Sequence, residues 1–397
     1  MNGRAGSQPA VPHEWIDDQR RFDDFLAVAV SADRVAIDTE FHRERTYWPN
    51  VALVQIAVAD HIALIDPVAV DLGGLARVLD GPATVVMHAA GQDLEVFHRV
   101  CGASPRDLFD TQVAAGFVGL STPALSSLVE RCTGVRLAKG DRLTDWFTRP
   151  LGDAQRTYAA SDVAYLFDVH DALRRELEEL GRLEWALDEC ATVSAPGRPT
   201  MPPELAWTRI KEARHLSGRA RAVGATLAEW REIRARSEDI PPRFILSDLA
   251  LVGVAQRAPR RAEDLRSVRG LDGRFLKDGG AAVILEQVEI GLAMDPKAVP
   301  APPVDRNRNL EQDLRPAVTL VIAWIAQLAR DVKLDPALLA TRDDVIDFLV
   351  DTNQGRLSSG WRNELVGSPI RALVEGRAAL AFEGKGRLVL ETRVPST

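Results

Sequence analysis

Two acidic residues, Asp38 and Glu40, end the apolar run 35–38 near the start of the sequence. Alternate residues of a β-strand point to the same side, so a strand here would place both carboxylates on one face. Such carboxylates repel each other, and they are tolerated at a solvated strand end or beside a divalent cation that offsets the repulsion. The Asp-x-Glu triplet alone is more typical of a solvated strand end, because short motifs often match by chance.

Three more residues extend this pattern. Tyr158 and Asp162 are four positions apart in a helical stretch, so the phenol and the carboxylate share one helix face. Asp93 lies near the start of another helical stretch, where the helix dipole alone also favours an aspartate. If these carboxylates converge, their hard oxygen atoms suit Mg²⁺ or Mn²⁺ rather than Zn²⁺. None of the seven histidines forms an i, i+4 pair of the kind that binds zinc, which agrees with this expectation.

The first half of the sequence mixes strand patterns with helical patterns. Short runs rich in Val, Ile and Leu predict buried strands, and they lie at residues 35–38, 51–58, 62–66 and 84–88. Amphipathic stretches predict helices at residues 91–100, 125–132 and 154–179. Together these patterns predict an α/β fold, in which a sheet is covered by helices.

The second half carries mostly helical periodicity and is divided by prolines. Two proline clusters predict linkers, at positions 196, 199, 202 and 203 and at positions 296, 300, 302 and 303. The helical stretches are residues 207–221, 227–236, 248–255, 280–292, 314–332 and 342–349. We therefore expect two small helix bundles after the α/β block.

Length and composition fit a protein of several globular domains. The 397 residues correspond to two to four domains, and 46% hydrophobic with 27% charged residues is an ordinary globular composition. No apolar run reaches the ~18 to 20 residues of a membrane span, and residues 1–18 lack the apolar core of a secretory signal. Three cysteines without a CxxC pair fit a reducing compartment, so we expect a cytoplasmic protein.

These residues carry a family resemblance. Three segments resemble the three motifs of the DEDD exonucleases. The first is Asp38-Thr39-Glu40-Phe41 with the following Leu53-Val54-Gln55, the second is the run from His88 through Asp93 to Phe97, and the third is Tyr158 with Asp162. The tyrosine assigns the resemblance to the DEDDy subgroup, and within it to ribonuclease D. The order of the motifs agrees with that family, with 53 positions from Glu40 to Asp93 and 69 from Asp93 to Asp162. His42 departs from the family pattern, which more often has an apolar or small residue there.

The resemblance also implies a domain organisation. It implies a ribonuclease H-like exonuclease domain with a mixed sheet flanked by helices, followed by two small all-helical HRDC-type domains. The expected boundaries are 1–195 for the exonuclease domain, 196–204 for a linker, 205–294 for the first HRDC domain, 295–308 for a second linker and 309–397 for a weaker HRDC-like copy. The sequence leaves open whether the third block binds nucleic acid or closes over the first.

The resemblance implies a two-metal-ion mechanism with named roles. Asp38 would bridge two divalent cations, Mg²⁺ or Mn²⁺, Glu40 and Asp162 would complete the first site, and Asp93 would hold the second. Tyr158, with an ordinary pKa near 10, would orient the attacking water. Two such cations can activate a water and stabilise the leaving 3′-oxygen.

Substrate contacts are expected in two places. Thr39, Phe41 and His88 lie within the motifs, where Phe41 is suited equally to stacking on a terminal base and to core packing. From Trp207 to Arg236 eight basic residues face three acidic ones, although the formal net charge of the chain is −8. Such a cluster can follow a phosphate backbone, and Arg209, Lys211 and Arg214 are its candidates for contacts with RNA. Without the resemblance, a solvated helix face explains the cluster better.

The expected function is that of a 3′-to-5′ exoribonuclease. It would trim the 3′ ends of structured RNA such as tRNA precursors, release nucleoside 5′-monophosphates, and act as a monomer without membrane association. A DNA exonuclease of the proofreading or helicase-associated type is the first alternative, because only contacts to the 2′-hydroxyl distinguish RNA from DNA, and single-stranded DNA is then a further partner. The second alternative is a non-catalytic scaffold that binds RNA. The third alternative is that the helical blocks serve only for contacts with other proteins.

Overall fold

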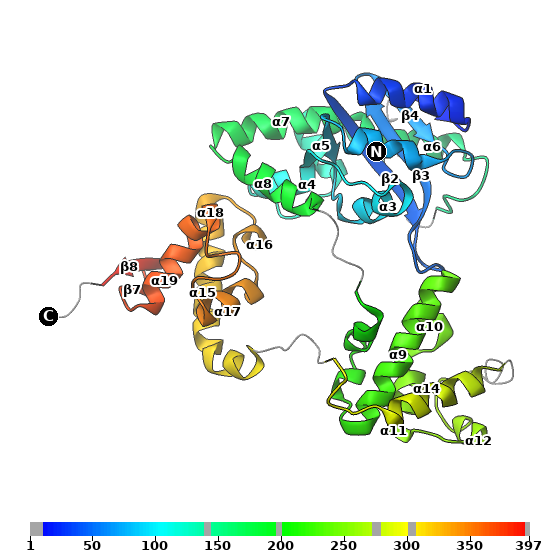
Figure 1. Cartoon of the computed structure of the whole chain (residues 1–397). Coiled ribbons are helices and arrows are strands. Elements are labelled where there is room, and N and C mark those ends of the chain that lie inside the picture. Colours follow the sequence, from blue (N-terminus) through cyan, green and yellow to red (C-terminus); the bar gives the residue numbers. More distant parts are fainter. Residues whose placement is uncertain (1–10, 139–143, 196–200, 272–278, 301–306, 394–397) are drawn as a thin grey trace, which may run out of the picture. The chain divides into compact units, whose positions relative to one another are not determined.

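The described part of the first block, up to residue 195, contains a mixed six-stranded sheet with strand order β1-β4-β3-β2-β5-β6. Figure 1 shows this sheet with the helices around it. The computed structural model describes residues 11–138, 144–195, 201–271, 279–300 and 307–393, without the side chains of 307–312. β2 and β5 are parallel, as are β5 and β6 and also β1 and β4, whereas β3 and β4 are antiparallel. The strands are β1 Glu14–Ile16, β2 Arg34–His42, β3 Asn50–Val58, β4 His61–Ile65, β5 Thr84–Met87 and β6 Leu108–Asp110.

Helices cover both faces of this sheet. One face packs against α1 and α3 in a core that contains Val35 and Ile37 of β2. The other face packs against α6 in a core that contains Ala36 of β2. The helices of this block are α1 Gln19–Val30, η1 Leu72–Leu75, α2 Ala76–Leu79, α3 Gly91–Cys101, α4 Thr111–Gly116, α5 Leu125–Thr133, α6 Asp153–Ala164, α7 Leu166–Glu179 and α8 Leu183–Ser194.

The predicted strands and most predicted helices of this block are confirmed. The single helix predicted over 154–179 was wrong in one respect, because the chain forms two helices, α6 and α7, that are separated at Tyr165. Tyr165 has φ −113° and ψ 4°, which lies outside helical geometry. Periodicity did not predict this break, because both helices continue an apolar pattern through it.

The middle block is helical, as expected. Its core is built on the buried Trp207 and on the long helix α9, which packs against α11 and α14 (Figure 1). The helix predicted over 207–221 was wrong for its first part, because two short 3₁₀ turns precede α9. The elements are η2 Pro203–Arg209, η3 Ala213–His215, α9 Gly218–Glu238, α10 Pro242–Ile245, α11 Asp248–Arg257, α12 Ala262–Leu265 and α14 Ala281–Ala293.

The third block contains helices and, at its end, a two-stranded antiparallel hairpin that helical periodicity did not predict. Its buried residues Trp324, Phe348 and Trp361 belong to the same hydrophobic core as Phe117 and Leu173 of the first block. The elements are α15 Asn307–Val332, α16 Pro336–Leu339, α17 Arg342–Val350, α18 Gly360–Arg362, η5 Asn363–Gly367, α19 Ser368–Val374, β7 Ala378–Phe382 and β8 Leu388–Thr392.

Polar contacts reinforce this shared core. The ring of Trp361 stacks on Trp185 at a centroid distance of 5.3 Å, and Arg362 pairs with Glu189. Arg182 donates to three backbone carbonyls, one of the first block and two of the third, at 2.6 to 3.1 Å. The third block therefore packs onto the first, which is one of the two possibilities that the sequence left open.

Contacts divide the chain into two units: one of Met1–Glu40, Val51–Gly197 and Arg306–Thr397, the other of Phe41–Asn50 and Arg198–Asp305. The three-domain boundaries expected from the sequence stay a prediction. Parts of both predicted linkers, residues 196–200 and 301–306, lie outside the described residues. In the part of the chain that the structure describes, we find no helix that combines the length and the apolar surface needed to cross a bilayer.

Candidate active site

The C-terminal half of β2 carries the first two carboxylates. β2 pairs with β5 at Arg34, Val35 and Ala36, and β5 ends at Met87. Asp38 and Glu40 therefore lie beyond the pairing with β5, at the carboxyl ends of two parallel strands. In open α/β sheets this edge is where ligands bind.

Strand alternation decides which side of the sheet each residue faces. Ala36 belongs to the core under α6, and Ile37 belongs to the core under α1 and α3. By alternation, Asp38 and Glu40 point to the α6 side and Thr39 points to the α3 side. The prediction rested on the same alternation, and the strand that it requires is present, since β2 runs from Arg34 to His42.

Helix α6 supplies the tyrosine and a third carboxylate. Its buried Ala159, Ala160 and Val163 pack in the core on this side of the sheet, with Tyr158 partly buried beside them. Tyr158 and Asp162 are one helical turn apart, and hydrogen bonding between the phenol and the carboxylate contributes to the pKa of each. The ring of Trp146 lies 6.0 Å from the ring of Tyr158, centroid to centroid, and supports it.

A partly buried ion pair anchors the segment that carries Trp146. The guanidinium of Arg149 donates Nε and Nη2 to the two carboxylate oxygens of Asp66 at 2.6 and 2.7 Å. It also donates to the backbone oxygens of Trp146 and Ala52, at 2.7 and 2.8 Å. Bidentate pairs of this kind fix geometry, so Arg149 ties the Trp146 segment to the sheet.

Asp93 provides the fourth carboxylate from the first turn of α3. It is 6% exposed, and its Oδ1 accepts a hydrogen bond from the hydroxyl of Thr39. Thr39, predicted as a substrate-binding residue, therefore fixes Asp93 and connects β2 with α3.

Asp110, to which sequence reasoning assigned no role, shapes the turn before Asp93. Its carboxylate accepts from the backbone N–H groups of Ala89 and Ala90, at 3.0 and 2.8 Å, and from Gln112 at 2.8 Å. Ala89 has φ 57°, a left-handed conformation that needs such support in a residue other than glycine. In the sequence, Asp110-Thr111 belongs to the residues that carry the family resemblance, but an aspartate at a helix start is too common to indicate this role.

The carboxylates lie within electrostatic range of one another. The pKa of Asp38 is raised well above its usual value by burial and by the charges of Asp93, Asp162 and Glu40. Burial raises the pKa of Glu40 to about 7, with a contribution from Asp93, and burial raises that of Asp93 to about 6. Asp162 is also shifted upward, by burial and by Glu40. Four acidic groups from β2, α3 and α6 thus share one site.

This donor set fits divalent cations. It consists of carboxylate oxygens, which are the ligands that Mg²⁺ and Mn²⁺ prefer, and a cation would relieve the mutual repulsion. Among the described residues, none of these four groups forms an ion pair with lysine or arginine. In the described ranges, no three His, Cys, Asp or Glu side chains already form a ligand cage.

The other predicted substrate residues have different surroundings. Phe41 is partly buried at the end of β2 and is compatible with both roles considered for it. His88 is held within the protein: its Nδ1 lies 2.9 Å from the Thr111 hydroxyl, and a hydrogen bond to the Pro123 backbone acts on its pKa, which burial lowers. Both contacts orient the ring toward the chain itself.

The basic cluster of the middle block is only partly available to a ligand. Arg231 is 6% exposed and donates to the backbone of Leu246 and to Asp248, both at 2.7 Å. Arg236 pairs with Glu232 at 2.9 Å. Fewer basic residues are therefore available to bind phosphates than the eight counted in the sequence. Four of the eight are exposed: Arg209, Lys211, Arg214 and Arg219.

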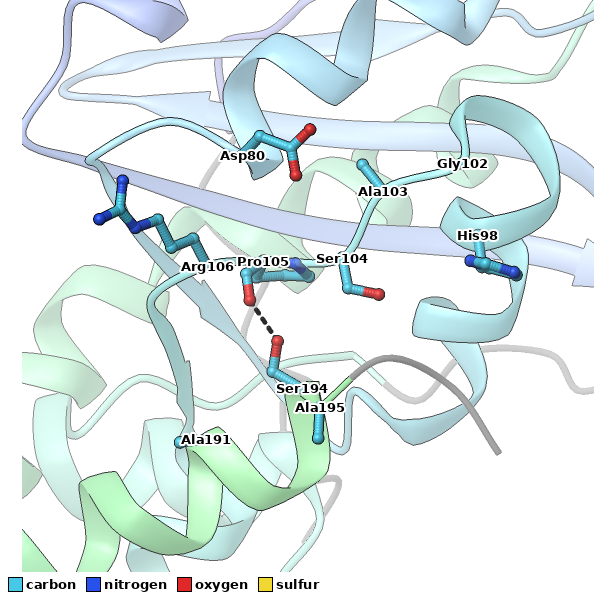
Figure 2. Close-up of a pocket in the computed structure, with 10 residues that line it drawn as sticks. All are labelled: Asp80, His98, Gly102, Ala103, Ser104, Pro105, Arg106, Ala191, Ser194 and Ala195. Atoms are coloured by element: carbon cyan, nitrogen blue, oxygen red, sulfur yellow. Dashed lines mark hydrogen bonds between the residues drawn. The ribbon is translucent and has the colours of Figure 1, made fainter. Parts of the chain in front are cut away.

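A surface pocket of about 430 Å³ lies elsewhere, between α3 and the end of α8. Figure 2 shows the Arg106 guanidinium and the His98 ring at opposite ends of it. Its lining contains none of the predicted site residues. Its polar groups do not converge on a common point, so the carboxylate cluster remains the better candidate for catalysis.

Comparisons with known proteins agree with this geometry. A model of 3′–5′ exonucleases matches residues 13–178, and a model of the HRDC domain matches residues 220–286. The chain is 34% identical to the ribonuclease D of Bartonella henselae over 359 residues, which cover 89% of this chain and 87% of that protein. It is 34% identical to the ribonuclease D of Zymomonas mobilis over 387 residues, which cover 95% of this chain and 98% of that protein.

A solved structure shows the same similarity. The crystal structure of Escherichia coli RNase D, described as an exoribonuclease involved in structured RNA processing, matches with a TM-score of 0.81 and 32% sequence identity. The match covers 92% of this chain and 99% of that one. The similarity therefore extends over all three blocks and is not confined to the exonuclease fold.

Proposed function

The chain belongs to the ribonuclease D family and is a 3′–5′ exoribonuclease, and from this premise we propose that its four clustered carboxylates hold two divalent cations at the site of RNA hydrolysis. The observation that carries the proposal is the shared electrostatic environment of these groups, which raises their pKa values and in which no described lysine or arginine takes part. The residues are Asp38, Glu40, Asp93 and Asp162.

Each carboxylate has a proposed place. Asp38, whose carboxylate is affected by the charges of the other three, would help to hold both cations. Glu40 and Asp162 would complete the ligands of the first cation, and Asp93 would serve the second. Bound cations of this kind supply Lewis acidity, which lowers the pKa of a coordinated water and offsets charge on the leaving oxygen. The protein's part is to hold the carboxylates in position, which Thr39 does for Asp93.

Tyr158 acts on the attacking water by orientation. The pKa of its phenol is raised by burial and by the charges of Asp162, Glu40 and Asp38, so the hydroxyl stays protonated at neutral pH. A protonated phenol can donate and accept hydrogen bonds, but it does not take the proton of the water as a phenolate would. The water proton therefore passes to solvent or to another group.

The proposed substrate is the 3′ end of structured RNA, with tRNA precursors as the representative case. Support comes from the E. coli relative, whose description names structured RNA processing. The products are nucleoside 5′-monophosphates. We propose that Phe41 stacks on the terminal base. The exposed side chains of Arg209, Lys211 and Arg214 are proposed to contact phosphates of the RNA. The protein is proposed to bind RNA as a monomer.

Exonucleases of this family depend on divalent cations. We propose that this protein binds two of them, and that they are Mg²⁺ or Mn²⁺. A cytoplasmic location is also a proposal. It is supported by the three cysteines, none of which forms a disulfide.

The test compares hydrolysis and binding in matched variants. Asp38→Asn and Asp162→Asn should lose Mg²⁺-dependent release of nucleoside monophosphates from a 3′-extended tRNA precursor while retaining RNA binding. Matched RNA and DNA oligonucleotides should be degraded with a preference for RNA. Hydrolysis that is unchanged in both variants would remove the site assignment, and preferential DNA digestion would favour the DNA exonuclease.

A further inference from the structure

Gln55, in the centre of β3, is a buried polar residue without a partner. Its side chain is 0% exposed, and neither its Nε2 nor its Oε1 has a hydrogen-bond partner among the described residues. Buried side-chain amides in native proteins nearly always have partners, and an exception calls for an explanation such as a bound water, an ion or a functional role.

The sheet places Gln55 on the side of the carboxylates. Gln55 lies opposite Leu64 of β4, and Leu64 belongs to the core under α6. Directly opposite residues of antiparallel strands point to the same face, so the amide of Gln55 faces α6. This is the face to which Asp38 and Glu40 of β2 also point.

Counted from the connection between β2 and β3, Asp38 and Gln55 lie at similar depths in their strands. The two strands are neighbours in the sheet, and residues 43–49 join them. A connection this short excludes the crossover that parallel strands need, so β3 runs back along β2. Asp38 lies four residues before the end of β2 at His42, and Gln55 lies five residues after the start of β3 at Asn50.

An amide suits this position chemically. It can donate a hydrogen bond to a carboxylate without adding a charge that competes with a cation, as lysine or arginine would. Residues that hydrogen-bond to a ligating group hold it in the binding geometry and are usually costly to replace. We propose that Gln55 is a positioning residue whose Nε2 donates, directly or through one water, to the Asp38 carboxylate in the cation-bound protein.

This inference rests on the proposed function of the carboxylates, because it assigns Gln55 to the Asp38 side chain in its ligating state. It differs from a packing role in one measurable respect. A packing residue contributes to stability whether or not cation is present, whereas a positioning residue contributes only when the carboxylate is drawn onto the cation.

The test uses Gln55→Leu, which keeps the approximate volume and removes the amide. Thermal unfolding of the full chain is measured in EDTA and again in the presence of Mn²⁺. The affinity for Mn²⁺ is measured from the paramagnetic resonance signal of the free cation. Steady-state kinetics on an RNA oligonucleotide give kcat and KM. In EDTA the variant should unfold at the same or a higher temperature, because an unpartnered buried amide has been removed. With Mn²⁺ its affinity for the cation should fall by about tenfold and kcat should fall, while KM for RNA stays the same.

Controls separate this inference from the proposed function. Asp38→Asn should abolish the stabilisation by Mn²⁺, and if it does not, the carboxylate assignment itself fails. If Asp38→Asn loses Mn²⁺ binding while Gln55→Leu keeps full affinity and kcat, only the role of Gln55 is overturned. Lower stability of Gln55→Leu in EDTA with unchanged Mn²⁺ affinity would assign Gln55 to packing. Gln55→Met, with an unbranched side chain of similar length, provides the same comparison if the leucine variant does not fold.

Discussion

The hydroxyl of Thr39 donates a hydrogen bond to the carboxylate of Asp93, and this bond joins the strand that carries Asp38 and Glu40 to the helix that carries Asp93. The two residues are 54 positions apart in the sequence. Thr39 faces the opposite side of the sheet from its two acidic neighbours, and so it reaches α3 while they face α6. The three consecutive residues 38–40 of β2 thus supply two carboxylates on the α6 side of the sheet and the contact that holds Asp93 on the α3 side.

Thr39→Val should reduce activity without unfolding the protein. Valine keeps the shape of threonine but cannot donate to Asp93, and this hydrogen bond lowers the pKa of Asp93 against the effect of burial. We expect the rate to fall by about tenfold, as for other residues that support a ligand, and the acidic limb of the pH–rate profile to move to higher pH. Thr39→Ser, which keeps the hydroxyl, should restore both. An unchanged pH profile in the valine variant would contradict this role.

The stability of the cation-free protein should fall as pH rises. The folded-state pKa values of Glu40 and Asp93, about 7 and about 6, lie above their ordinary values of 4.5 and 3.8. The folded state therefore binds more protons than the unfolded state between about pH 4 and pH 7, and the free energy of unfolding decreases with pH across this window. Thermal unfolding in EDTA at pH 5 and pH 8 measures this decrease.

Two comparisons isolate the contribution of the site to that pH dependence. Glu40→Gln should flatten the curve, because the glutamine cannot ionise. Mn²⁺ should stabilise the protein more at pH 8 than at pH 5, since cation and protons compete for the same oxygens. Equal stabilisation at both pH values, with a curve that Glu40→Gln leaves unaltered, would count against a shared carboxylate site.

Tyr158→Phe should separate chemistry from cation binding. The phenol is assigned to orient water and is not a cation ligand, so its loss should lower kcat by about a hundredfold while the Mn²⁺ affinity stays near that of the wild type. Asp162→Asn, one turn further along α6, is the matched comparison and should lose both. If Tyr158→Phe weakens Mn²⁺ binding as strongly as Asp162→Asn does, the phenol has a different role from the one assigned here.

The exposed basic residues of the middle block should govern the salt dependence of RNA binding. Replacing Arg209, Lys211 and Arg214 together by alanine should weaken RNA binding and reduce the slope of log K against log salt by about 2, given about 0.7 per phosphate contact on a single strand. Arg20→Ala, which removes an exposed charge from α1, should leave the slope unchanged. A slope that the triple variant does not alter would mean that these side chains do not contact phosphates.

The sequence predicted those parts of the site that depend on local periodicity. Asp38 and Glu40 share a face because a strand alternates, and Tyr158 and Asp162 share a face because a helix repeats every 3.6 residues. The link from Thr39 to Asp93 was not predictable from periodicity, because it depends on how α3 packs against β2. The contacts of Asp110 were not predictable for the same reason, since its partners Ala89 and Ala90 are distant in sequence.

Charge counting was less informative than periodicity. Arg231 and Arg236 contributed to the predicted basic cluster, but the structure uses both in internal contacts, with Asp248 and Glu232. A formal charge in a sequence does not indicate whether a side chain meets solvent or a carboxylate in the folded state. The packing of the third block on the first depends likewise on tertiary contacts, such as that between Trp361 and Trp185.

The most direct test of the central claim is anomalous diffraction from crystals of the full chain soaked in Mn²⁺. We expect two anomalous peaks about 3.5 to 4 Å apart, the spacing typical of two-metal sites, within coordination distance of Asp38, Glu40, Asp93 and Asp162. Mn²⁺ peaks at other residues, or none beside these carboxylates in crystals of a protein that hydrolyses RNA with Mn²⁺, would contradict the account.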